Sequence, residues 1–191
     1  TAYEIMPSLV GSEMCIRDRF PRAWTVYDFS DYDLQLTCTQ MSPVIGDNYR
    51  ESSFPVGLFR WRLENVGTRP VEASLMLTWE NTSVPSRRPH QDDFTQGRVT
   101  EHEAIIELGH GDAREEYPVS FGLGLRCEDG GVCLQEVFDT EGDGSDVWEL
   151  FSKKGQVDES ATDRRRPDHR SGTALCAHVE LLPGDSKDAL F

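Results

Sequence analysis

The segment FRWRLENVGTRPVEASLMLTWE, residues 59–80, decides the fold of this 191-residue chain. Apolar and polar side chains alternate on both sides of residues 65–70, which is typical of half-buried β-strands. Asn, Gly and Pro within residues 65–70 favour a chain reversal. The segment therefore predicts two antiparallel strands joined as a β-hairpin, with Trp79 packed in the core on the apolar face of that hairpin.

The same alternation continues along the rest of the chain. It predicts strands at residues 34–39, 104–108, 119–127, 132–138 and 173–182, with a second hairpin turning at residues 129–131. One helix is expected at residues 147–153, beginning after Ser145 or Asp146 and ending at Gly155. Long polar loops are expected at residues 82–97 and 157–171. This pattern predicts an all-β fold, an antiparallel two-sheet β-sandwich with one short helix and long polar loops.

The charge balance argues against several classes of partner. Acidic side chains number 34 and basic ones 19, so the formal net charge is −15. Such a surface repels the phosphates of nucleic acids and anionic lipid headgroups. No apolar run approaches the roughly 20 residues that span a bilayer. We therefore expect no nucleic-acid partner and no transmembrane segment.

The cysteines point to a reducing compartment. The chain has 5 cysteines, Cys15, Cys38, Cys127, Cys133 and Cys176, and none forms a C-x-x-C motif. This odd number and scattered spacing favour free thiols and a cytoplasmic location. The alternative is a disulfide between Cys127 and Cys133 across the predicted second hairpin.

Both ends of the chain differ from the rest. Residues 1–19 show neither strand nor helix periodicity, and MPSLVGSEMCIRDR within them resembles a translated sequencing-adapter fragment. We expect residues 1–19 to be non-native and adapter-like and to pack poorly; the alternative is an irregular native arm. A new apolar run begins at Ala189, just before the last residue, Phe191. Residues 20–191 are therefore expected to be one β-domain truncated at both ends.

An acidic loop is the best metal candidate. Asp139, Glu141 and Asp143 stand at alternate positions before Gly144, as in a calcium-binding loop. Counted from Asp139 as position one, position twelve of the loop is Leu150, where an EF-hand requires glutamate, so an EF-hand is excluded. A looser calcium site at these three acids stays open, whereas the preferred interpretation is an acidic turn at the start of the helix with no metal or cofactor.

Several blocks of sequence resemble the N-terminal domain of glycoside hydrolase family 116, which includes the non-lysosomal glucosylceramidase (bile acid β-glucosidase) and bacterial β-glucosidases. The resemblance covers about residues 20–191. The blocks, in order, are AWTVY at 23–27, LTCTQMSPVI at 36–45, SSFPVG at 52–57, LTWEN at 77–81, GDGSDVW at 142–148 and LCA at 175–177.

The resemblance implies a scaffold function. In this family the N-terminal β-sandwich packs on a C-terminal (α/α)₆ barrel, which holds the nucleophilic glutamate and the acid/base aspartate of a retaining mechanism. This chain would therefore contain no catalytic residue, would shape the entrance of the barrel, and would serve a parent enzyme acting on a glucoside or glucosylceramide. The alternative is a stand-alone carbohydrate-binding module, with Trp24 or Trp148 as the sugar contact.

Overall fold

The computed structural model describes residues 14–81, 94–110, 119–159 and 171–191. Its described residues divide into two compact units. The terminal unit comprises residues 14–73 and 179–191, and the middle unit lies within residues 74–178. The chain leaves the terminal unit inside one strand, after Ala73, and re-enters it inside another, at Val179.

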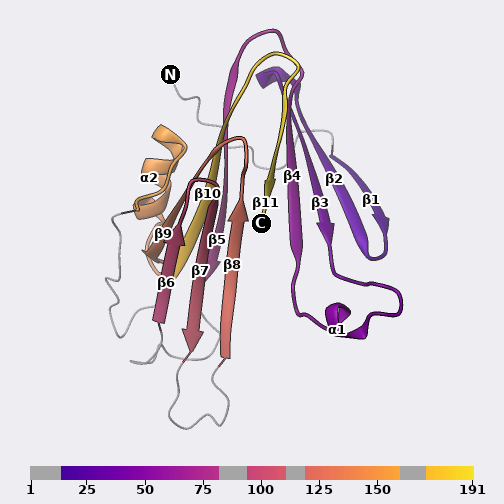
Figure 1. Ribbon diagram of the computed structural model, residues 1–191. Helices are drawn as coiled ribbons and strands as arrows, with labels where there is room; N and C mark the ends of the chain where they lie inside the picture. The colour runs from indigo at the N-terminus through magenta and orange to yellow at the C-terminus, as the bar shows by residue number, and fades with distance from the viewer. Residues whose placement is uncertain (1–13, 82–93, 111–118, 160–170) are drawn as a thin grey trace. The chain divides into compact units, whose positions relative to one another are not determined.

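The terminal unit is an antiparallel sheet with strand order β1-β2-β3-β4-β11 (Figure 1). A single turn of 3₁₀ helix, Ser30–Tyr32, joins β2 to β3, and a four-residue helix, α1 (Tyr49–Ser52), lies in the connection from β3 to β4. The strands are β1 (Met14–Arg19), β2 (Arg22–Phe29), β3 (Leu34–Met41), β4 (Leu58–Asn65) and β11 (Ser186–Leu190).

Alternation gives this sheet one apolar and one polar face. Leu36 lies opposite Tyr27 on β2 and opposite Leu63 on β4, so these three side chains share the apolar face. Leu36 and Leu63 are buried, and the rings of Tyr27 and Trp61 stack with their centroids 5.7 Å apart. Burying such side chains contributes about 1.5–3 kcal/mol each, which fixes the register of the strands.

The middle unit contains two antiparallel sheets. One has the order β8-β7-β6 and the other β5-β10-β9, and β6 and β7 both contact β9. These contacts pack the two sheets against each other. The strands are β5 (Val71–Glu80), β6 (Phe94–Val99), β7 (Glu103–His110), β8 (Val119–Arg126), β9 (Gly131–Asp139) and β10 (Ser171–Leu181).

Strand β10 is the centre of the second sheet and is almost wholly buried. Leu175 and Ala177 contribute to the core with Ile106 and Leu108 of β7, all at or near zero exposure. The buried Thr173 hydroxyl donates to the backbone carbonyl of Gln135 at 3.0 Å, so even its polar atom is satisfied.

Helix α2 (Ser145–Lys154) packs beside β9. Val147 is buried against Ala174 and Cys176 of β10, and Phe151 packs on the same cluster. The helix ends at Gly155, whose φ of 64° is the left-handed conformation that closes many helices, and whose N–H donates to the carbonyl of Phe151. The predicted helix and its Gly155 end are confirmed, although Ser145 is already helical and Gly144 precedes it.

The all-β, antiparallel fold class is confirmed, but both predicted hairpins are wrong. Strand β4 pairs with β3 and β11, whereas β5 pairs with β10. Strand β8 pairs with β7, whereas β9 pairs with β10. Both short turns carry the chain from one sheet to another, because alternation specifies which face of a strand is apolar and not which strand pairs with it.

Four of the described strands, β1, β2, β6 and β11, form where no strand was predicted. Strand β6 occupies residues 94–99, inside the expected polar loop 82–97, and strand β1 occupies residues 14–19, inside the segment expected to be irregular. Strand β1 pairs along its full length with β2. Residues 1–13, 82–93 and 160–170, on which parts of the other loop and end predictions fall, lie outside the described residues. No helix among the described residues is long and apolar enough to cross a membrane.

Candidate interaction surface

Exposed apolar side chains among the described residues of the terminal unit gather on the connection between β3 and β4. We call this connection, residues 42–57, the α1 loop; α1 lies beyond the ends of the two strands in Figure 1. Tyr49 is 87% exposed and Phe54 55% exposed. The exposed large apolar side chains of this loop are Val44, Ile45, Tyr49, Phe54 and Val56, and the exposed Phe59 follows at the start of β4.

The α1 loop is held in shape by its own polar groups. The Ser52 hydroxyl accepts from the backbone N–H of Ile45 at 2.9 Å and donates to the carbonyl of Ile45 at 3.2 Å. The Asn48 side chain accepts from the N–H of Glu51 at 3.2 Å and so caps α1. No residue of α1 is buried. Fixed backbone bonds therefore present apolar side chains to solvent without a core beneath the helix.

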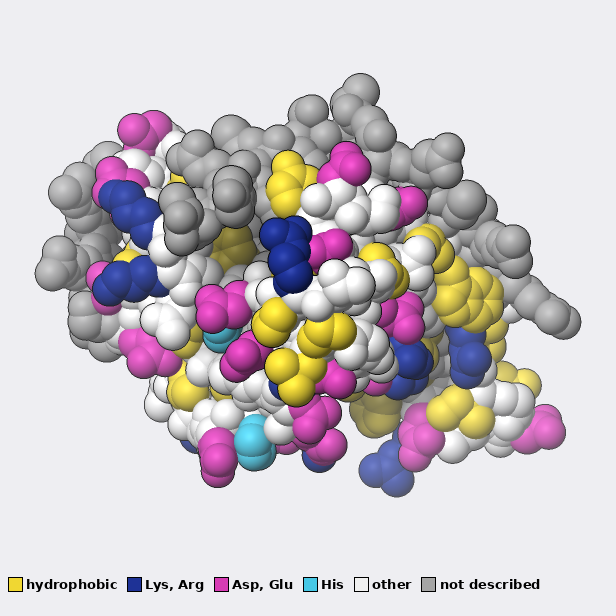
Figure 2. All heavy atoms as spheres, turned by 90° about the horizontal axis from the view of Figure 1, so that it is seen from above, with side chains coloured by type: hydrophobic (Ala, Val, Ile, Leu, Met, Phe, Trp, Pro, Cys, Tyr) yellow, Lys and Arg dark blue, Asp and Glu magenta, His cyan; other side chains and the backbone are white. Residues whose placement is uncertain are grey.

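Such a surface is unusual for a chain of this charge. Figure 2 shows acidic and basic side chains spread over the face it displays, with hydrophobic side chains exposed among them. Single exposed apolar residues need no explanation, but a cluster on one loop marks a site that another surface covers. Aromatic side chains are the type that contributes most to such contacts.

The two predicted sugar-contact residues lie in different units. Trp24, in β2 of the terminal unit, lies opposite Thr39 and is partly buried. Trp148, on α2 of the middle unit, is 38% exposed, and its ring lies 5.6 Å from that of Phe151. The two tryptophans are therefore two separate candidate sites for sugar contact.

Trp79 corrects a prediction. It was expected to pack in the core on the apolar face of β5, but its side chain is 47% exposed. The neighbouring inward-facing positions Leu75 and Leu77 are only partly buried. Strand β5 is the edge strand of the β5-β10-β9 sheet, so it has a neighbouring strand on one side only.

The acidic loop before α2 binds its own backbone. Asp139 accepts from the N–H of Glu141 at 2.9 Å, and Asp143 accepts from the N–H of Ser145 at 3.0 Å. The hydrogen bonds from Ser145 lower the pKa of the Asp143 carboxyl. Asp146 accepts from the N–H of Asp139 at 2.7 Å. Within the described residues, no group of three or more His, Cys, Asp or Glu side chains is arranged to hold a metal ion.

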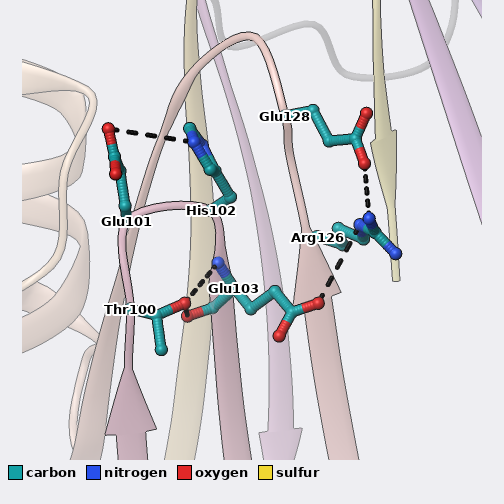
Figure 3. A pocket seen from close by; sticks show the side chains of 6 residues that line it. All are labelled: Thr100, Glu101, His102, Glu103, Arg126 and Glu128. Carbon is teal, nitrogen blue, oxygen red and sulfur yellow. Dashed lines mark hydrogen bonds and ion pairs between the residues drawn. The ribbon is translucent and has the colours of Figure 1, made fainter.

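An open pocket of about 490 Å³ lies at one end of β7 and β8 (Figure 3). Arg126 lies between Glu103, at 3.9 Å, and Glu128, and so pairs with both carboxylates. All three side chains are largely exposed. Since one guanidinium engages both acids, these residues form a solvated ion-pair group. The lining residues are Thr100, Glu101, His102, Glu103, Arg126 and Glu128.

No disulfide joins the four cysteines whose state the structure gives, which are Cys38, Cys127, Cys133 and Cys176. The cross-strand neighbour of Cys133 is Cys176 on β10, and not Cys127. Sequence reasoning missed this pair because the register of β9 against β10 joins segments separated by the whole of α2 and the following loop. No local signal in the sequence indicates it.

One comparison identifies the family of the chain. The sequence profile described as "beta-glucosidase 2, glycosyl-hydrolase family 116 N-term" matches residues 6–191. The match covers all of the described structure, including β1 and the α1 loop. The resemblance of the quoted sequence blocks is therefore confirmed, and the chain belongs to the N-terminal domain family of glycoside hydrolase family 116.

Proposed function

We propose that this chain is the non-catalytic β-domain of a retaining β-glucosidase and that it packs against the (α/α)₆ catalytic barrel of its parent enzyme. The nucleophile and the acid/base residue belong to the barrel, where the two carboxyl groups of a retaining enzyme stand about 5 Å apart. The contribution of this chain is a rigid surface that supports the barrel and shapes its entrance. The parent substrate is a β-glucoside, with glucosylceramide as the specific proposal.

The exposed α1 loop is the observation that carries this proposal. An N-terminal domain family implies a catalytic domain as partner. Tyr49 and Phe54 are the large aromatic side chains that such a partner would bury, and the Ser52 and Asn48 hydrogen bonds hold the loop ready to receive it. A preformed loop loses little conformational entropy on docking, which favours association.

A cytoplasmic location is part of the same proposal. Reduced thiols at Cys38, Cys133 and Cys176 support it, because reducing compartments keep thiols from forming disulfides. The structure adds the Cys133 and Cys176 pair, two thiols in adjacent strands that an oxidising compartment would be expected to join.

An activity assay tests the non-catalytic role. The purified chain should not hydrolyse a chromogenic β-glucoside, and it should form a complex with a separately expressed family 116 catalytic domain on size-exclusion chromatography. Hydrolysis by the chain alone, abolished by a point substitution within it, would overturn the proposal.

Carbohydrate binding by the isolated chain is the second candidate. Trp148 favours it, because a 38% exposed indole beside Phe151 offers an apolar platform to a sugar ring. Trp24 favours it through its position opposite Thr39, a polar neighbour on the same sheet face. Calorimetric titration with a β-glucoside distinguishes the two candidates: saturable binding lost in Trp148→Ala or Trp24→Ala supports the module, and no saturable binding removes it.

A further inference from the structure

Two thiols face each other across neighbouring strands of the middle unit. Cys133 of β9 and Cys176 of β10 are directly opposed in the antiparallel register. Opposed residues of antiparallel strands have Cα atoms about 4.5–5.5 Å apart. Disulfides need Cα atoms about 4.4–6.8 Å apart, so the backbone already provides the spacing of a disulfide.

The two thiols have unequal environments. Cys176 is fully buried, and its S–H donates to the carbonyl of Gly155 at 3.2 Å. Cys133 is partly exposed at the margin of the cluster formed by Val147, Val157 and Cys176. Cys133 is therefore the more accessible of the two residues to a small reagent from solvent.

Electrostatics favours the exposed sulfur as the nucleophile. The neighbouring Cys176 thiol, whose S–H can turn from the Gly155 carbonyl to a Cys133 thiolate, lowers the pKa of Cys133 to about 7; burial opposes this shift and the backbone N–H of Val157 adds to it. The same contact and burial raise the pKa of Cys176. The thiolate is the reactive form of cysteine, so near neutral pH Cys133 reacts first.

We propose that Cys133 and Cys176 are a redox-active pair that a peroxide converts to a disulfide. The Cys133 thiolate attacks one oxygen of hydrogen peroxide, the O–O bond breaks, and Cys133 becomes a sulfenic acid with release of hydroxide. Cys176 then gives up its proton and attacks the Cys133 sulfur; the S–S bond forms and the hydroxyl leaves as water. Overall, two thiols lose two electrons and two protons, and one peroxide becomes two waters.

The disulfide would change how α2 is held. Oxidation removes the S–H of Cys176, and with it the hydrogen bond to the Gly155 carbonyl at the end of α2. The new disulfide links β9 and β10 covalently and closes a loop of the chain that contains α2. Closing such a long loop restricts the unfolded chain, so the melting temperature of the oxidised chain should rise by about 5 °C or more.

Mass spectrometry of the whole chain tests the proposal. After treatment with stoichiometric hydrogen peroxide at neutral pH, the intact mass should fall by two hydrogen atoms. Non-reducing peptide mapping should show Cys133 linked to Cys176, and dithiothreitol should reverse the change. In Cys176→Ala, Cys133 should stop at a sulfenic acid that dimedone traps, because the second thiol is missing.

Cys38→Ala is the matched control, since Cys38 is also a buried strand thiol and burial raises its pKa to about 11. It should form the link as the unsubstituted chain does. A chain that keeps its thiols reduced, that links other cysteines first, or that oxidises Cys133 further while Cys176 stays a thiol would overturn the proposal.

Discussion

The side-chain amide of Asn65 donates to the backbone carbonyl of Leu181 at 3.0 Å, across 116 residues of sequence. The same nitrogen donates to the carbonyl of Arg69 at 2.7 Å, and the side-chain oxygen accepts from the N–H of Gly67 at 3.0 Å. Asn65 is only 3% exposed. One buried amide therefore joins the end of β4, the turn that follows it and the segment that returns to the terminal unit.

Replacing Asn65 with Ala should lower the free energy of unfolding by about 2–3 kcal/mol, because three backbone groups lose their partner in a buried site. Urea denaturation measures this change. Val66→Ser, at the exposed next position, is the control and should lie within about 0.5 kcal/mol of the unsubstituted chain. A loss at Asn65 no larger than at Val66 would refute this account.

Gly155 and Gly144 provide a matched pair at the two ends of α2. Both have positive φ, at 64° and 78°. A Cβ at Gly155 would overlap the Ser74 hydroxyl, which bonds to His178 at 2.8 Å, whereas a Cβ at Gly144 would meet nothing within 4 Å. Gly144→Ala should therefore cost about 1 kcal/mol for its backbone alone, and Gly155→Ala clearly more. Equal losses on thermal or urea unfolding would show that the contact with Ser74 is unimportant.

The melting temperature should not respond to calcium or to a chelator. Asp139 and Asp143 already accept backbone hydrogen bonds in the turn before α2, so their oxygens have partners without a metal. Asp143→Asn gives a second measurement, since it should change the melting temperature slightly and by the same amount with and without calcium. A rise in melting temperature on adding calcium that Asp143→Asn removes would instead establish the looser calcium site.

Among Cys38, Cys127, Cys133 and Cys176, we expect Cys133 to react first with iodoacetamide at neutral pH. Because its pKa is lowered to about 7, its thiolate is present above pH 7 and disappears as the pH falls below it. The contact with Cys176 is the main cause, and burial and the nearby Glu159 charge oppose it. Alkylation followed by peptide mass spectrometry should show a half-maximal rate near pH 7, and Cys176→Ala should move that midpoint upward. If the midpoint does not move in Cys176→Ala, the contact with Cys176 is not the cause of the lowered pKa of Cys133.

The sequence predicted strands well and their pairing poorly. Alternation located most of β3, β4, β5, β7, β8, β9 and β10, because one face of each is apolar. It could not show that β4 and β5 belong to different sheets, since a turn between sheets has the same Asn, Gly and Pro residues as a hairpin turn. Strand β6 escaped notice because Gln96 and Arg98 share the face of Phe94, and so no clean alternation remains.

Local sequence patterns could not predict the α1-loop surface or the Cys133 and Cys176 pair, because both depend on the folded structure. The α1 loop contains the end of the quoted block LTCTQMSPVI and the whole block SSFPVG, but only the structure shows that its apolar side chains are exposed. Cys133 and Cys176 are brought together by the β9–β10 register, which depends on the whole middle unit.

Binding to the catalytic domain tests the central claim most directly. Isothermal titration calorimetry should compare the unsubstituted chain, the double variant Tyr49→Ser with Phe54→Ser, and Val66→Ser, whose side chain is 54% exposed outside the α1 loop. If the α1 loop docks the barrel, the double variant should raise the Kd at least about tenfold, equivalent to about 1.4 kcal/mol, and Val66→Ser should leave it unchanged. A folded double variant that binds the catalytic domain with the Kd of the unsubstituted chain would contradict the account.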